Sequence, residues 1–101
     1  MIVEYIHYQL ASHTKEQLVH AYAQASAHLR AAPQCLGYEL AQCAEDDKSC
    51  VLRITWTSLR EHMEDFRKGP NFPPFLALIR PFVSEIAEMR HYDPTAVTWT
   101  R

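Results

Sequence analysis

The chain has 101 residues, of which 48% are hydrophobic, and its formal net charge at pH 7 is -2. This length suits a single domain with one core, and the near-neutral charge without a basic run argues against nucleic-acid binding. The N-terminus lacks the pattern of a secretion signal, and no apolar run is long enough to span a membrane. We therefore expect a cytoplasmic domain that binds neither nucleic acid nor membrane.

The three cysteines form an odd set without a close C-x-x-C pair, which favours a reducing compartment. Cys43 and Cys50 flank one predicted hairpin and could face each other across it. Small disulfide-stabilised scaffolds usually carry more cysteines than this chain does. We therefore expect free thiols, with a Cys43–Cys50 bridge as the less favoured alternative.

The first half of the chain predicts a strand, a helix and a pair of strands. Residues 2–10 alternate between two unlike faces, which is typical of a strand. Thr14 and Gln17 form a capping-box pattern, apolar residues then recur at helical spacing, and a proline ends the helix. Two strand-like segments, residues 35–43 and 50–57, follow on either side of an acidic turn.

The next predicted element is a helix capped by Ser58. Its expected buried face carries Leu59, Met63 and Phe66, with His62 on the edge of that face. His62 would then be a partly solvated surface residue.

The chain breaks and restarts at "GPNFPP". If Asn71 caps the restarted helix, both following prolines fall in the first turn, where a missing N–H loses no partner. Arg80 precedes a proline and is expected to leave helical geometry. Residues 82–92 then supply a last strand, before a polar tail at residues 93–101.

This order is the βαββαβ pattern of a ferredoxin-like α+β domain, with two helices on one face of a four-stranded antiparallel sheet. The other face would be too apolar for an ordinary solvated surface. We expect it to pack against the same face of a second copy in a homodimer, with Trp99 of the tail reaching the partner. Its expected residues are Val3, Tyr5, His7, Val51, Arg53 and Thr55.

Over residues 1–92 the chain resembles the antibiotic biosynthesis monooxygenase family of dimeric α+β barrel proteins. The resemblance rests on "MIVEYIHYQL", "CLGYEL", "VLRITWTSLREHMEDFRKGPNFPPFLALIRPFV" and "EMRHY", and it looks like the branch that is sometimes joined to truncated globins. It implies a homodimer with a ligand pocket in each subunit between helices and sheet. The reaction stays open, because some members oxidise quinols or polyphenols with O2 and no cofactor, others cleave haem, and a few isomerise sugar phosphates.

This chain also differs from members of the family at several functional positions. Haem-degrading relatives place an Asn, a Trp and a His where this chain aligns Ile6, Phe66 and Leu76, which argues against haem cleavage. Quinol-oxidising relatives often carry a histidine about one helical turn beyond the position of His62. This chain has Asp65 and Phe66 there, so giving that role to His62 requires a shift along the helix.

Two residues are candidate proton acceptors. An imidazole with an ordinary pKa of about 6.5, such as His62, could take a phenolic proton near neutral pH. Glu4 is the one charged residue on an otherwise apolar strand face, where it could reach solvent or pair with Arg90. If Glu4 is instead buried in the pocket, its pKa would rise and it could serve as a base.

The remaining candidates would form the substrate-binding wall. Trp56 lies at a predicted strand end, where a tryptophan most often packs in the core. If it lines a pocket instead, its indole N–H could donate to a quinone oxygen. The full predicted wall is Trp56, Tyr8, Phe66, Phe72, Phe75 and Ile79. The six histidines show no zinc-binding spacing, so no metal is expected, but His7 and His91 could meet across adjacent strands on the dimer face.

The leading hypothesis is a cofactor-independent oxygenase that acts with O2 on a quinol or polyphenol. The alternative is a non-catalytic dimer that binds a small apolar ligand or docks on a truncated globin.

Overall fold

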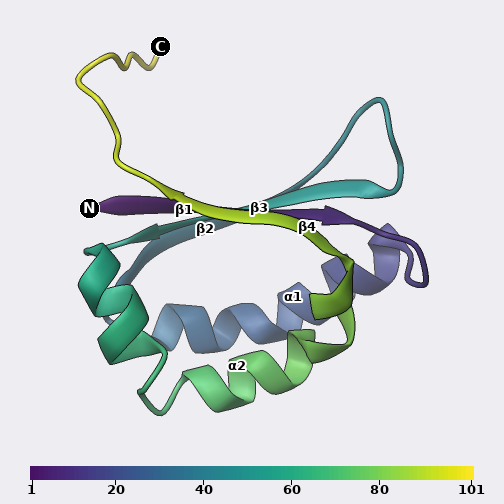
Figure 1. Ribbon diagram of the computed structural model, residues 1–101, viewed down its shortest axis with the longest axis horizontal. Coiled ribbons are helices and arrows are strands. Elements are labelled where there is room, and N and C mark those ends of the chain that lie inside the picture. The colour runs from purple at the N-terminus through teal and green to yellow at the C-terminus, as the bar shows by residue number, and fades with distance from the viewer.

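The computed structural model describes residues 1–101 and has the predicted βαββαβ order. The four strands run in the order β2-β3-β1-β4, and every neighbouring pair is antiparallel. Figure 1 shows α1 and α2 on one face of this sheet, while no helix covers the other face. The main elements are β1 (Ile2–Gln9), α1 (Lys15–Ala31), β2 (Cys35–Gln42), β3 (Ser49–Trp56), α2 (Phe72–Ile79) and β4 (Ile86–Tyr92). The prediction of a ferredoxin-like α+β domain is confirmed.

The sequence correctly predicted how α1 begins and which face it buries. The Gln17 N–H donates to Thr14 Oγ1 at 3.2 Å, and the Thr14 N–H donates to Gln17 Oε1 at 2.9 Å, which completes the capping box. The inward face is almost wholly inaccessible to solvent and consists of Leu18, Tyr22, Ala25, Ser26 and Leu29. None of the helices is both long enough and apolar enough to cross a membrane.

The helix after β3 differs from the prediction. It contains a π-helical segment, η1 (Glu61–Phe66), in which His62 and Phe66 are buried. Leu59 and Met63, the two other residues predicted to be buried, are 46% and 39% exposed. Backbone bonds in a π-helix join residues five apart, so the inward positions no longer follow α-helical spacing. The expectation of a surface position for His62 is therefore wrong.

The segment after α2 also differs from the prediction. Arg80 keeps right-handed helical backbone angles and opens a 3-10 segment, η2 (Arg80–Glu85), so β4 begins at Ile86 rather than at residue 82. A proline is tolerated there because first-turn N–H groups have no helical partner. Asn71 stands at the N-cap of α2 as predicted, but its side chain makes no capping bond.

The uncovered sheet face carries the predicted residues. The register of β1 against β3 pairs Val3 with Thr55, Tyr5 with Arg53 and His7 with Val51. Tyr92 of β4 adds an aromatic ring, whose centroid lies 5.4 Å from that of Tyr5 in an edge-on arrangement. Figure 1 shows the tail leaving the end of β4 on this same side of the sheet, away from the helices.

Two side-chain pairings considered from the sequence are not formed. His91 lies opposite Glu4 on the helical side of the sheet, whereas His7 lies on the uncovered side and contacts Ser49, so the expected His7–His91 pair is wrong. The three cysteines are free, as expected, and Cys43 and Cys50 form no bridge.

Glu85, the last residue of η2, accepts hydrogen bonds from the loop between β1 and α1 and holds that loop in place. The backbone N–H groups of Ala11, Ser12 and His13 all donate to its Oε1, and His13 Nδ1 contacts its Oε2. These bonds, led by that from Ala11, lower the pKa of Glu85 from 4.5 to about 2. The folded state therefore favours the ionised form. The stability that Glu85 confers is present above pH 4.5 and is lost as the pH falls toward about 2.

We expect Glu85→Gln to lower the melting temperature at pH 7 and to flatten the loss of stability between pH 4.5 and about 2. The reason is that a neutral amide accepts the loop N–H bonds more weakly and does not titrate in this range. Thermal unfolding followed by circular dichroism across this pH range measures both effects. Glu45→Gln, at an exposed position, is the matched control. Identical acid profiles for the two variants would contradict the role of Glu85.

Candidate active site

A cavity of about 340 Å³ lies between the sheet and the helical layer, a volume within the range of small-molecule sites. Twelve of its fifteen lining residues are hydrophobic, which suits a largely apolar ligand. The lining includes all eight residues that the sequence analysis singled out: Glu4, Tyr8, Trp56, His62, Phe66, Phe72, Phe75 and Ile79. The structure thus brings the predicted site residues together, while their roles remain predictions.

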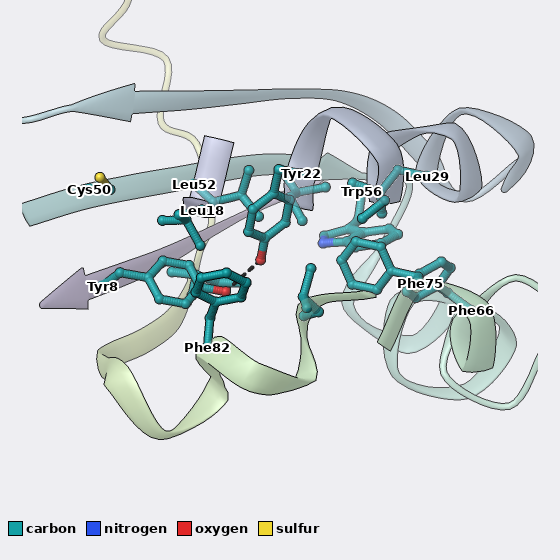
Figure 2. Close-up of a cluster of buried hydrophobic side chains, with 14 of the residues drawn as sticks. Tyr8, Leu18, Tyr22, Leu29, Cys50, Leu52, Trp56, Phe66, Phe75 and Phe82 are labelled. Atoms are coloured by element: carbon teal, nitrogen blue, oxygen red, sulfur yellow. Dashed lines mark hydrogen bonds between the residues drawn. The ribbon is translucent and has the colours of Figure 1, made fainter. Parts of the chain in front are cut away.

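One wall of the cavity is aromatic. The Phe66 ring lies 5.6 Å from the Phe72 ring and 5.9 Å from the Phe75 ring, both in edge-on contact. Trp56 packs 4.7 Å from Phe66 between ring centroids. Figure 2 shows Trp56, Phe75 and Phe66 gathered on one side of the buried cluster. Such a wall suits a flat, apolar ring system.

Glu4 lies on the inner face of the sheet and is only 2% exposed. The Trp56 indole N–H donates to Glu4 Oε1 at 3.0 Å, across the β1–β3 pair. Neither structural alternative for Glu4 holds, because Arg90 lies opposite Tyr5 on the uncovered face and contacts Glu88 instead. Glu4 is thus a buried carboxylate with one indole donor.

Burial raises the pKa of Glu4 above its ordinary value of 4.5, and the Trp56 hydrogen bond and the positive charge of Arg67 oppose part of this rise. Low polarity around a carboxyl disfavours its charged form, which makes the carboxylate a stronger proton acceptor. Glu4 Oε2 accepts no hydrogen bond from the protein. This oxygen remains available to a ligand.

His62 lies flat against Trp56, with ring centroids 4.0 Å apart and planes 10° from parallel. Its Nδ1 is hydrogen-bonded to His91 Nε2 at 2.9 Å, and its Nε2 lies 3.7 Å from Glu4 Oε1. Burial, followed by the influence of His91 and Arg67, lowers the pKa of His62 to about 3. His62 is therefore neutral near pH 7, and these opposite shifts favour Glu4 over His62 as the candidate base.

His91 belongs to the same cluster, although the sequence analysis placed it on the dimer face. It pairs with Glu4 in the β1–β4 register, and its Nε2 lies 3.7 Å from Glu4 Oε2. A register shift between His7 and Tyr8 separates the two halves of this strand pair. The alternation within β4 could have indicated an inward His91, but only if the register against β1 had been known.

Glu4, His62 and His91 bring three potential ligand atoms within 4.8 Å of one another. Two imidazoles and a carboxylate also hold divalent transition metals in some proteins. Two observations favour proton handling instead. The His62–His91 hydrogen bond already engages one nitrogen of each ring, and the Arg67 guanidinium acts electrostatically on all three residues, which would oppose a second cation.

A pair of phenols supplies the other polar feature of the pocket region. Tyr8 from β1 and Tyr22 from α1 are hydrogen-bonded through their hydroxyl oxygens at 2.5 Å, as the dashed line in Figure 2 shows. Burial raises the pKa of Tyr8 to about 12. Both hydroxyls therefore stay protonated. Tyr8 lines the cavity, so when Tyr22 donates the hydrogen bond of the pair, the Tyr8 O–H is free to donate to an oxygen on a ligand.

Comparison with known proteins gives the same fold and a family. Residues 1–78 match the sequence pattern of the antibiotic biosynthesis monooxygenases. The uncharacterized protein YczJ of Bacillus subtilis is 22% identical over 79 residues, which cover 78% of this chain and 83% of that protein.

Solved structures extend the similarity over nearly the whole chain. A protein from Bordetella bronchiseptica named a putative antibiotic biosynthesis monooxygenase is 23% identical with a TM-score of 0.76, covering 93% of this chain and 96% of that one. A mutant of SnoaB from Streptomyces nogalater, a cofactor-independent oxygenase, is 17% identical with a TM-score of 0.68, covering 97% and 94%. At these identities the structural matches establish the fold alone. The sequence match over residues 1–78, which is most of the chain, establishes that this protein belongs to the antibiotic biosynthesis monooxygenase family.

Proposed function

We propose that this protein is a cofactor-independent monooxygenase that oxidises an electron-rich aromatic of the quinol or polyphenol type with O2. It would act in the cytoplasm, where its three free cysteines stay reduced. The observation that carries this proposal is the buried Glu4 carboxylate, with its raised pKa, at the edge of an aromatic cavity. Membership of a family of monooxygenases supports it further.

The chemistry requires little of the protein beyond a base and a dry, shaped cavity. Glu4 takes a proton from the bound phenol or from an acidic ring methylene, and the resulting anion passes one electron to O2. The substrate radical and superoxide then combine to a peroxide, which takes up a proton and loses water. In sum, a ring methylene loses both hydrogens, one atom of O2 becomes the carbonyl oxygen, and the other leaves as water. The Tyr8 hydroxyl, with Tyr22 as the donor within the pair, would donate to the charge that develops on oxygen.

An oxygen-electrode assay on a panel of hydroquinones and anthrones tests this function. We expect O2 uptake that depends on the protein and is unchanged by a metal chelator, with label from isotopically enriched O2 in the product of a methylene substrate. Tight binding of panel members without O2 uptake would contradict catalysis. It would favour the alternative of a non-catalytic module for small ligands, or for docking on a truncated globin.

We also propose that two copies pack through the uncovered sheet face, with residues 93–101 contacting the partner and residues 1–92 forming the family domain. Family members are typically dimeric. Tyr5 and Tyr92 are 40% and 46% exposed on this face, and Trp99 in the tail is 73% exposed. Tyr5 and Tyr92 are in ring contact, and exposed apolar groups that lie together in this way are typical of a protein interface.

Tyr5→Glu is expected to convert the dimer to a monomer, because it places a charge in the centre of the buried interface. Light scattering coupled to size exclusion measures the mass. Val19→Glu is the matched control, since Val19 is 41% exposed on α1 and lies on the helical side, and it should remain dimeric. A wild-type monomer at micromolar concentration would remove the proposal.

A further inference from the structure

We propose that His91 carries protons between the buried Glu4–His62 pair and solvent. This inference rests on the proposed function, because it concerns the proton that Glu4 takes from the substrate. His91 Nε2 is 2.9 Å from His62 Nδ1 and 3.7 Å from Glu4 Oε2, so the imidazole contacts both members of the pair. It would act through Glu4 and His62 rather than on the substrate itself.

Burial explains why a carrier is needed. The side chains of Glu4 and His62 are 2% and 3% exposed, whereas that of His91 is 20% exposed. The cavity next to Glu4 is mostly apolar, and a bound aromatic would displace water from it. While the site is occupied, a route from Glu4 to solvent that does not cross the ligand runs through His91, the partly exposed neighbour. Such a route lets Glu4 exchange its proton with solvent in addition to returning it to the peroxide.

The strand pairing fixes His91 in this place. β4 is an edge strand, and its register places His91 opposite Glu4 on the inner face of the sheet. Arg90 and Tyr92, its neighbours in β4, pair with Tyr5 and Val3 of the uncovered face. His91 is thus the residue of β4 that connects the buried carboxylate to the edge of the sheet.

The charged and titratable groups that face His91 are Glu4 from β1, His62 from η1 and Arg67, which follows η1. Burial and the positive charge of Arg67 lower the pKa of His91 below 6.5. Near pH 7 His91 is therefore neutral and can accept a proton. Because burial and the Arg67 charge disfavour the protonated imidazole, His91 also releases the proton readily, as a carrier requires.

Two variants of His91 separate proton transfer from structural support. His91→Ala removes the ring, and His91→Gln keeps a group that can hydrogen-bond to His62 but cannot carry a proton. We expect kcat to fall about 10- to 100-fold in both, below the range for a full acid–base residue, with KM nearly unchanged. Added imidazole should restore His91→Ala with saturation. His20→Ala, at an exposed position on α1, is the control and should behave as wild type.

A measurement without substrate keeps this test independent of the proposed function. In protein labelled with nitrogen-15, the imidazole N–H of His62 should exchange with water more slowly in His91→Gln than in wild type. If no panel compound is oxidised, the proposed function fails, and the exchange rates alone decide the relay.

Three results would overturn the relay. One is a wild-type kcat in His91→Gln, and another is equal exchange rates in His91→Gln and wild type. The third is stoichiometric Zn²⁺ binding to the wild type that His91→Gln abolishes, because that would assign the cluster to a metal.

Discussion

Trp56→Ala is expected to lower the free energy of unfolding by about 3–5 kcal/mol, the usual cost of truncating a large buried aromatic residue. Trp56 is 1% exposed and is among the largest fully buried side chains. It stacks on His62 and packs against Phe66, with centroid distances of 4.0 and 4.7 Å. Its removal would leave a cavity and also take away the only side-chain donor to Glu4. Urea unfolding followed by circular dichroism measures the loss.

Trp56→Phe separates the hydrogen bond from the packing. Phenylalanine keeps much of the ring contact but lacks the N–H that donates to Glu4 Oε1. We expect an intermediate loss of about 1–3 kcal/mol, typical of an unsatisfied buried acceptor, and a further rise in the pKa of Glu4. Leu59→Ala is the control, because Leu59 is 46% exposed and should change stability by no more than about 0.5 kcal/mol. Equal losses in the Trp56 and Leu59 variants would contradict this account.

The sequence predicted those parts of the fold that depend on local patterns. Alternation in β1 separated Glu4 and Tyr8 from Tyr5 and His7 because successive side chains of a strand point to opposite faces. The Thr14–Gln17 capping box set the start of α1 for a similar reason, since the bonds that form it lie within one turn. The aromatic cavity wall was predicted with the help of the family resemblance, which implies a pocket between helices and sheet.

The parts that were missed depend on geometry that local patterns do not encode. The π-helical segment turned His62 inward and Leu59 outward, because its wider turn breaks the 3.6-residue spacing. His91 joined the site through the register of β4 against β1, which changes between His7 and Tyr8. A single-residue change in register moves a side chain to the other face. The sequence also left both candidate bases open, because the shifts that favour Glu4 depend on the burial of each group and on its neighbours in the fold, Trp56, His91 and Arg67.

Glu4→Gln is expected to reduce kcat/KM by about 100-fold or more, the usual effect of removing a general base. The amide keeps the size of Glu4 and can still accept the Trp56 N–H, so the pocket should stay intact. Oxygen-electrode rates across pH measure the effect. The rise of activity with pH that reports ionisation of Glu4, at a pKa above 4.5, should be absent from the variant. Rates that equal those of wild type would exclude Glu4 as the base.

The same substitution should stabilise the protein at neutral pH. The raised pKa means that folded Glu4 holds its proton more tightly than the unfolded chain does, so stability decreases as the pH rises above 4.5. Glutamine removes that dependence, because it is neutral at every pH. We therefore expect a higher melting temperature near pH 7 together with lost activity, whereas a purely structural Glu4 would lose stability on substitution. Glu16→Gln, at an exposed position in the first turn of α1, is the control for both measurements.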